Sequence, residues 1–108
     1  MKNKWRLPTI DELSLMFNKE MGEPRISGFG QQIYWSSTPH AYRRNFAWIV
    51  YFGSGYTDFY NKSTPFYVRC VRRAKNGKLE WSGQSKTEMT WDEANEYCKE
   101  MNGKANTN

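Results

Sequence analysis

The chain has 108 residues, of which 38% are hydrophobic and 17% are aromatic. This length and composition fit one folded domain and exclude a disordered tail, because disordered chains are poor in aromatic residues. No apolar run reaches the roughly 20 residues of a membrane span, and we expect no membrane insertion. The start of the chain has no apolar signal-peptide core, so no export signal is expected in it. The net charge of +5 is compatible with a polyanionic partner, whether glycan, nucleic acid or anionic surface.

The first predicted element is a helix from Ile10 to about Met21. Thr9 and Glu12 form a capping box, in which each side chain binds the backbone amide of the other residue. Gly22 stands where a left-handed C-terminal cap belongs. The apolar stripe of this helix consists of Leu13, Met16 and Phe17.

The middle of the chain is rich in aromatic and β-branched residues, in segments bounded by Gly, Pro, Asn and Ser, which is typical of strands. The predicted strands are 33–36, 47–52, 56–60, 66–72 and 79–81. Gly53-Ser54-Gly55 predicts a tight hairpin, and Asn76-Gly77 predicts a type I′ turn that pairs 79–81 back on 68–73. The segments therefore indicate an antiparallel sheet.

A second capping box, Thr90 with Glu93, predicts another helix near the C-terminus, with Gly103 as its end. Its apolar stripe consists of Ala94, Tyr97, Cys98 and Met101. The predicted fold class is α+β, with two helices packed on one twisted antiparallel sheet.

Cys70 and Cys98 are the only cysteines, and they lack the CxxC spacing of zinc and redox sites. With a single histidine in the chain, we expect neither a metal site nor another cofactor. From the residues alone, a disulfide and two buried free thiols both remain open.

Five motifs follow one another between residues 5 and 72. They are Trp5-Arg6-Leu7-Pro8-Thr9, Glu12-Leu13, Tyr34-Trp35-Ser36-Ser37-Thr38, Ala47-Trp48 before Gly53, and Tyr67-Val68-Arg69-Cys70-Val71-Arg72. Together they resemble the Lcl C-terminal-like family of bacterial C-type-lectin-like modules, which is distantly similar to formylglycine-generating sulfatase-modifying proteins. The resemblance implies a C-type-lectin-like fold for a single domain over 1–108. It also implies a Cys70–Cys98 disulfide, which favours an extracellular or cell-surface parent protein.

The order of the motifs indicates a circular permutant. Residues 5–73 match the C-terminal part of the family, residues 79–103 resemble its N-terminal part, and the Asn76-Gly77 turn joins the two. The alternative is a fragment of a tandem array whose tail helix completes a neighbouring molecule. We expect a monomer, because the short turn folds the tail back onto its own sheet, with a swapped dimer or trimer as the other outcome.

Catalysis is not expected, because the only histidine has no nucleophile beside it. The resemblance places ligand sites on the loops 38–46 and 53–65. Tyrosine and arginine there offer amphipathic surface and forked donors that suit sulfate, carboxylate and sugar faces. The candidate ligand-binding residues are His40, Tyr42, Arg43, Arg44, Asn45, Tyr56, Asp58, Tyr60, Asn61 and Lys62.

These observations predict a non-enzymatic binding or adhesion module of a bacterial surface or secreted protein, with an anionic glycan or a protein as its ligand. A structural or oligomerisation module and a diversified receptor-type domain are the alternatives. Nucleic acid is disfavoured, because the basic residues are spread along the chain and no recognition helix is visible. Calcium-dependent sugar binding is not supported. In the sugar-binding loop of calcium-dependent lectins, Glu-Pro is followed by Asn or Asp, whereas Glu23-Pro24 is followed here by Arg25.

Several conspicuous residues are expected to be structural. Arg6 is expected to bind Asp11 or Glu12, and Arg69 and Arg72 are expected to be solvated or in ion pairs. The residues expected to fill the core are Trp5, Trp35, Trp48, Trp81 and Trp91.

Overall fold

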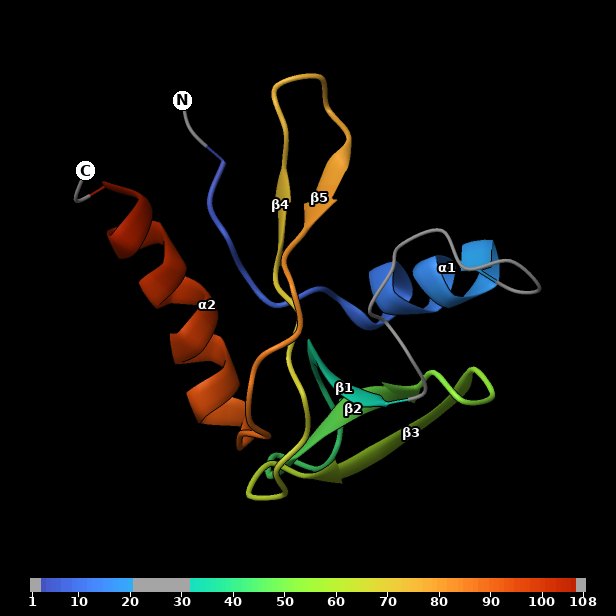
Figure 1. Cartoon of the computed structure of the whole chain (residues 1–108). Coiled ribbons are helices and arrows are strands. Elements are labelled where there is room, and N and C mark those ends of the chain that lie inside the picture. Colours follow the sequence, from blue (N-terminus) through green and yellow to red (C-terminus); the bar gives the residue numbers. More distant parts are fainter. Residues whose placement is uncertain (1–2, 21–31, 107–108) are drawn as a thin grey trace.

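The computed structural model describes residues 3–20 and 32–106, and it is an α+β fold with two helices and two antiparallel sheets (Figure 1). One sheet has three strands in the order β1-β2-β3, and the other pairs β4 with β5. The helices are α1 (Ile10–Glu20) and α2 (Trp91–Asn106). The strands are β1 (Ile33–Pro39), β2 (Phe46–Tyr51), β3 (Tyr56–Asn61), β4 (Val71–Arg73) and β5 (Leu79–Trp81).

Both faces of the three-stranded sheet contribute side chains to a buried core cluster, because successive side chains of a strand point to opposite sides. On β1, Trp35 joins a core cluster that includes side chains of α2, whereas Tyr34 joins a cluster that includes Leu13 of α1. On β2, Ile49 pairs with Trp35 and belongs to the first cluster, whereas Val50 pairs with Tyr34 and belongs to the second. The two helices therefore pack on opposite faces of this sheet.

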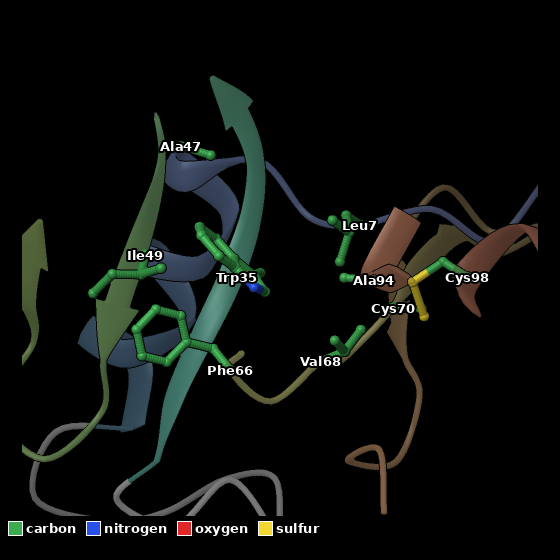
Figure 2. Packing of buried hydrophobic residues seen from close by; sticks show 9 residues of the cluster. All are labelled: Leu7, Trp35, Ala47, Ile49, Phe66, Val68, Cys70, Ala94 and Cys98. Carbon is green, nitrogen blue, oxygen red and sulfur yellow. A yellow bond between two sulfur atoms is a disulfide. The ribbon is translucent and has the colours of Figure 1, made fainter. Parts of the chain in front are cut away.

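The larger core cluster connects the sheet to the N-terminal segment and to α2 (Figure 2). It ends at the Cys70–Cys98 disulfide, which lies beside Ala94 and Val68. The structure thus confirms the pairing that the family resemblance implies. The buried members of the cluster are Leu7, Trp35, Ala47, Ile49, Phe66, Val68, Cys70, Ala94 and Cys98.

Both helices begin as the capping boxes predict. The Glu12 N–H donates to Thr9 Oγ1 at 3.1 Å, and the Thr9 N–H donates to Glu12 Oε1 at 2.8 Å. At the second helix, the Thr90 N–H donates to Glu93 Oε1 at 2.9 Å. The predicted partner of Arg6 is also confirmed, because its guanidinium makes two bonds of 2.9 Å to the Glu12 carboxylate.

The predicted end of the second helix at Gly103 is wrong, because α2 continues to Asn106. Asn102 holds this turn against the N-terminal segment, accepting the Trp5 N–H at 2.7 Å and donating to the Trp5 carbonyl at 3.1 Å. A glycine inside a helix costs only about 1 kcal/mol, which such contacts can offset. The predicted helix end at 21–22 and the 23–25 segment lie outside the described residues.

The predicted strand 66–72 is wrong in its first part, since regular pairing begins only with β4. Phe66 forms a single antiparallel bridge to Met89, and Tyr67 forms a single parallel bridge to Tyr34. Because these two neighbouring residues pair with different segments, residues 66 and 67 do not form a continuous strand pairing with either segment. The expected single sheet is consequently divided into two.

Both predicted hairpins form, and β4 pairs with β5 as expected. Gly55 and Gly77 adopt left-handed φ values of 83° and 87° at the two turns. Asn76 does not have a positive φ, so the predicted type I′ turn is wrong. The Gly77 N–H donates to the Ala74 carbonyl and the Ala74 N–H to the Lys78 carbonyl, which indicates a longer turn followed by a left-handed glycine.

Arg69 and Arg72, which lie close to Cys70 in the chain, have different surroundings. Arg72 binds Glu80 at 2.7 Å, as expected. Arg69 is buried and only 3% exposed, so the expectation of a solvated side chain is wrong. Its Nη1 donates to the Ser82 carbonyl at 2.8 Å, and its guanidinium carbon lies 5.9 Å from the centre of the Tyr34 ring.

Candidate ligand-binding face

The strand register divides the predicted site residues between two surfaces. Phe59 of β3 stands opposite Trp48 of β2, whereas the next residue, Tyr60, stands opposite Ala47, which belongs to the core. Because neighbouring strand residues point to opposite sides, Tyr60 lies on the other face from Phe59. His40 packs against the Phe59 ring, so the structure does not bring all the predicted residues together.

One surface of the sheet carries four half-buried aromatic rings, which we call the aromatic face: His40, Phe46, Trp48 and Phe59. The His40 ring centroid lies 4.4 Å from that of Phe59 and 5.7 Å from that of Trp48, on which it stacks at 12°. Phe59 meets Trp48 at 5.3 Å and Phe46 at 5.8 Å, both edge to face. These are the preferred geometries of aromatic pairs, so the rings form a continuous, preorganised surface.

His40 also fixes the loop that borders this face. Its Nδ1 accepts the backbone N–H groups of Tyr42 and Arg43, each at 3.1 Å. The His40 N–H donates to the Phe46 carbonyl at 2.9 Å, and the Phe46 N–H donates to the Arg43 carbonyl at 3.0 Å. His40 therefore positions the loop and, being half-buried, is not the freely exposed side chain that a loop histidine commonly is.

Two arginines extend from this loop. The guanidinium carbon of Arg43 lies 5.7 Å from the centre of the Phe46 ring, and Arg44 is exposed. Neither forms an ion pair with any acidic residue in the described part of the chain. Tyr42 beside them is 92% exposed. Forked donors next to aromatic rings are suited to carboxylate or sulfate groups.

The opposite surface of β3 carries Tyr56 and Asp58. The Tyr56 hydroxyl donates to Asp58 Oδ2 at 3.4 Å, and the negative charge of Asp58 raises the pKa of the Tyr56 phenol above 10.0. The other oxygen, Oδ1, accepts the Phe59 N–H at 2.7 Å. This carboxylate repels anions, so the surface is poorly suited to the predicted ligand.

The remaining candidates of this segment are occupied by contacts within the chain. The Lys62 ammonium lies 4.2 Å from the centre of the Trp91 ring. Tyr60 packs edge to face on Phe66, with centroids 5.1 Å apart. Asn61 Oδ1 accepts the N–H and hydroxyl of Ser63, at 2.9 and 2.8 Å, and shapes a turn.

Asn45 links the two predicted loops through its backbone. Its carbonyl accepts the Lys62 N–H at 2.7 Å, and its side chain is exposed beside Arg44. Asn45 therefore belongs to the loop between His40 and Phe46, two residues of the aromatic face.

Sequence reasoning missed Phe46 and Phe59 and assigned Trp48 to the core. Trp35 is fully buried, and the other three tryptophans pack partly against the core clusters. Trp48 instead lies half-buried on the aromatic face. The alternation of residues along β2 could have identified this face. Phe46 and Trp48 alternate with the core residues Ala47 and Ile49, and Phe59 pairs with Trp48 across the hairpin.

The described residues contain no group of three His, Cys, Asp or Glu side chains that could hold a metal ion. None of the helices in that part of the chain is long and apolar enough to cross a membrane. The Cys70–Cys98 disulfide suggests an extracellular environment, because such bonds persist in oxidising compartments.

Comparison with known proteins adds one assignment. No curated protein and no solved structure matches the chain. The family model of the Lcl C-terminal domain matches residues 1–72, which is two thirds of the sequence and ends within β4. The chain therefore belongs to the Lcl C-terminal domain family.

Proposed function

We propose that the chain is a non-enzymatic binding or adhesion module that holds an anionic glycan or an anionic protein surface against the aromatic face and the loop 40–45. The observation that carries this proposal is the placement of Arg43 over the Phe46 ring of the aromatic face, with the exposed Arg44 next to it in the chain. Neither arginine has an ion-pair partner in the described residues. The rings offer flat apolar area, and the guanidinium groups offer charged donors.

The proposed site is narrower than the two loops that the sequence indicates. It keeps His40, Tyr42, Arg43, Arg44 and Asn45 and adds the other rings of the aromatic face. Residues of the opposite surface are left out of the proposed site. The negative charge of Asp58 would repel an anionic ligand, and the Lys62 ammonium already lies over the Trp91 ring.

The finer structural assignments are part of the same proposal. The fold is a circularly permuted C-type-lectin-like one in which residues 79–103 take the place of the family's usual first segment, and the parent protein is secreted or attached to the cell surface. Contacts within the chain support closure as a monomer: Asn102 binds Trp5, and the Trp91 indole N–H donates to the Ser36 carbonyl at 2.9 Å. Light scattering coupled to size-exclusion chromatography tests this, and an obligate dimer or trimer would favour the oligomerisation module instead.

The binding proposal is tested on an array of sulfated and neutral glycans and single-stranded DNA, in a salt series with and without a calcium chelator. The variant Arg43→Gln/Arg44→Gln is compared with Lys86→Gln/Lys99→Gln, which removes the same charge from exposed positions elsewhere. We expect selective, chelator-insensitive binding of sulfated glycans that the arginine variant weakens about tenfold, the sum of two exposed ion pairs. Equal loss in both variants, or equal binding of every polyanion, would reduce the site to a general basic surface.

A further inference from the structure

The dipeptide Asn-Gly occurs twice in the chain, at Asn76-Gly77 and at Asn102-Gly103. Asparagine is thermolabile, because the backbone nitrogen of the next residue can attack the carbonyl carbon of its side chain. Glycine in the next position obstructs this attack least, since it has no side chain and a permissive backbone. No other asparagine of the sequence precedes a glycine. The structure gives the two copies of this dipeptide contrasting surroundings.

Asn76 and Gly77 lie in the turn that joins β4 to β5, and both are exposed. Figure 1 shows this turn projecting from the molecule, away from the three-stranded sheet. A Cβ atom placed on Gly77 would meet nothing within 4 Å apart from its neighbours in the chain, so no other side chain blocks access to this peptide. An exposed turn with so few contacts opens locally at little cost in free energy.

The side-chain carbonyl of Asn76 is already polarised by a hydrogen bond. Its Oδ1 accepts the Lys78 N–H at 3.0 Å, which folds the side chain over the Gly77 peptide. A donor in this position stabilises the negative charge that develops on Oδ1 when a nucleophile adds to Cγ. The Gly77 N–H donates to the Ala74 carbonyl at 2.9 Å, so this bond must open before the nitrogen can lose its proton.

The amide of Asn102 is held at both of its ends. Its Oδ1 accepts the Trp5 N–H at 2.7 Å, and its Nδ2 donates to the Trp5 carbonyl at 3.1 Å. Gly103 lies inside α2, where each backbone N–H donates to the carbonyl four residues earlier. Attack at Asn102 therefore requires the helix to unwind and the contact with Trp5 to break.

We propose that Asn76 is a site of spontaneous deamidation and that the fold protects Asn102 from the same reaction. The Gly77 nitrogen loses its proton and forms a bond to Asn76 Cγ, while the Cγ–Nδ2 bond breaks and ammonia leaves with that proton. Water then adds to either carbonyl of the resulting five-membered succinimide and opens it to aspartate or isoaspartate. The reaction consumes one water, releases one ammonia and requires no oxidant or enzyme.

The modification changes both the charge and the backbone of the turn. A carboxylate replaces a neutral amide between Lys75 and Lys78, and the net charge of +5 falls by one. In the isoaspartyl product the main chain gains a methylene group, so the hydrogen bond from Gly77 to Ala74 loses its geometry. The β4–β5 hairpin is then less well ordered. This proposal is independent of the proposed function, because it involves no ligand.

The test is incubation of the full oxidised chain at mildly alkaline pH, followed by intact-mass measurement and peptide mapping. Enzymatic methylation of isoaspartyl carboxyl groups counts that product separately. We expect the mass gain of an amide-to-acid change at Asn76, with isoaspartate as one product, and a rate at Asn102 that is at least about tenfold lower. In the reduced chain in urea, where neither site is folded, the two rates should become similar.

Gly77→Ala should slow the modification at Asn76, because the added methyl group obstructs attack by the backbone nitrogen. Gly103→Ala is the matched control and should leave the rate at Asn76 unchanged. Asn76→Gln is a second variant that keeps an amide but requires a larger ring, and it should abolish the fast phase without straining the backbone. Equal rates at Asn76 and Asn102 in the folded chain would overturn the proposal. A contrast of the same size in urea, or an unchanged rate at Asn76 in Gly77→Ala, would also overturn it.

Discussion

The imidazole of His40 stacks on the indole of Trp48 while its Nδ1 accepts the Arg43 backbone N–H at 3.1 Å. One side chain thus connects the aromatic rings of the sheet to the loop that carries the arginines. The two contacts use different parts of the imidazole, the ring face and a ring nitrogen. Substitutions can therefore separate them.

His40→Phe keeps an aromatic ring and removes the acceptor, whereas His40→Asn keeps a short acceptor and removes the ring. We expect the Tyr42 and Arg43 amides to exchange with solvent faster in His40→Phe than in His40→Asn, because only the phenylalanine leaves both N–H groups without their partner. Hydrogen exchange followed by NMR measures this. The reverse ranking would show that ring packing, and not Nδ1, holds the loop.

The disulfide is expected to be a large contributor to stability. It closes a segment of 28 residues and ties α2 to the segment that enters β4. On the chain-entropy model, its loss in Cys70→Ala/Cys98→Ala lowers the free energy of unfolding by about 3 to 4 kcal/mol. Urea denaturation of the oxidised wild type and the double variant measures the difference.

The matched reference for the disulfide variant is the reduced and alkylated wild type, since the chain has no other cysteine. Both should lose stability and keep helical content if α2 is also held by Asn102 and Trp91. A double variant as stable as the oxidised wild type would contradict the predicted role.

The elements with local signals were predictable from the sequence. Thr9 with Glu12 and Thr90 with Glu93 determine the helix starts through contacts three residues apart, and these pairs are visible in the sequence. The end of α2 depends on the Asn102–Trp5 contact, which spans 97 positions and has no local signature. Long-range partners likewise divided the predicted 66–72 strand.

The candidate site was predicted in part for a related reason. Grouping residues by loop places Tyr56 and Asp58 with His40, because they are close in the chain. Strand parity separates them, since Asp58 and Phe59 point to opposite sides of β3. The register of β2 with β3, set by the turn at Gly55, decides which residues share a face with Trp48.

The two left-handed glycines are predicted to differ in their tolerance of a side chain. Gly77 has φ 87° and open space around a Cβ atom, so Gly77→Ala should cost only the backbone strain of about 1 to 2 kcal/mol. At Gly55, φ 83° is combined with overlap between the new Cβ and the Phe17 ring. Gly55→Ala should therefore cost more, by at least about 1 kcal/mol.

Thermal and urea denaturation of both glycine variants measure this difference. Gly77→Asn is a useful third variant, because asparagine tolerates the left-handed region better than alanine. Equal destabilisation by Gly55→Ala and Gly77→Ala would show that α1 shifts to accommodate the methyl group.

The Arg6–Glu12 contact is predicted to make stability depend on pH. The hydrogen bonds from Arg6 are the main reason that the pKa of Glu12 lies below 4.5. A carboxyl group whose pKa is lower in the folded state stabilises the fold above its unfolded pKa, and this stabilisation is lost as the pH falls through the folded pKa. Glu12→Gln should therefore lower the free energy of unfolding at pH 7 by about 0.5 to 1 kcal/mol, the scale of a cap and an exposed pair.

The difference between wild type and Glu12→Gln should shrink as the pH is lowered towards about 2, because protonation makes the Glu12 side chain neutral like that of glutamine. Asp11→Asn is the matched control, because it removes an exposed carboxylate from the adjacent position of α1. Urea denaturation at both pH values measures the effect, and Asp11→Asn should change the slope of stability with pH less than Glu12→Gln does. A Glu12→Gln deficit of the same size at both pH values would mean that the side chain acts through packing and neutral hydrogen bonds, and that its ionisation contributes nothing to the start of α1.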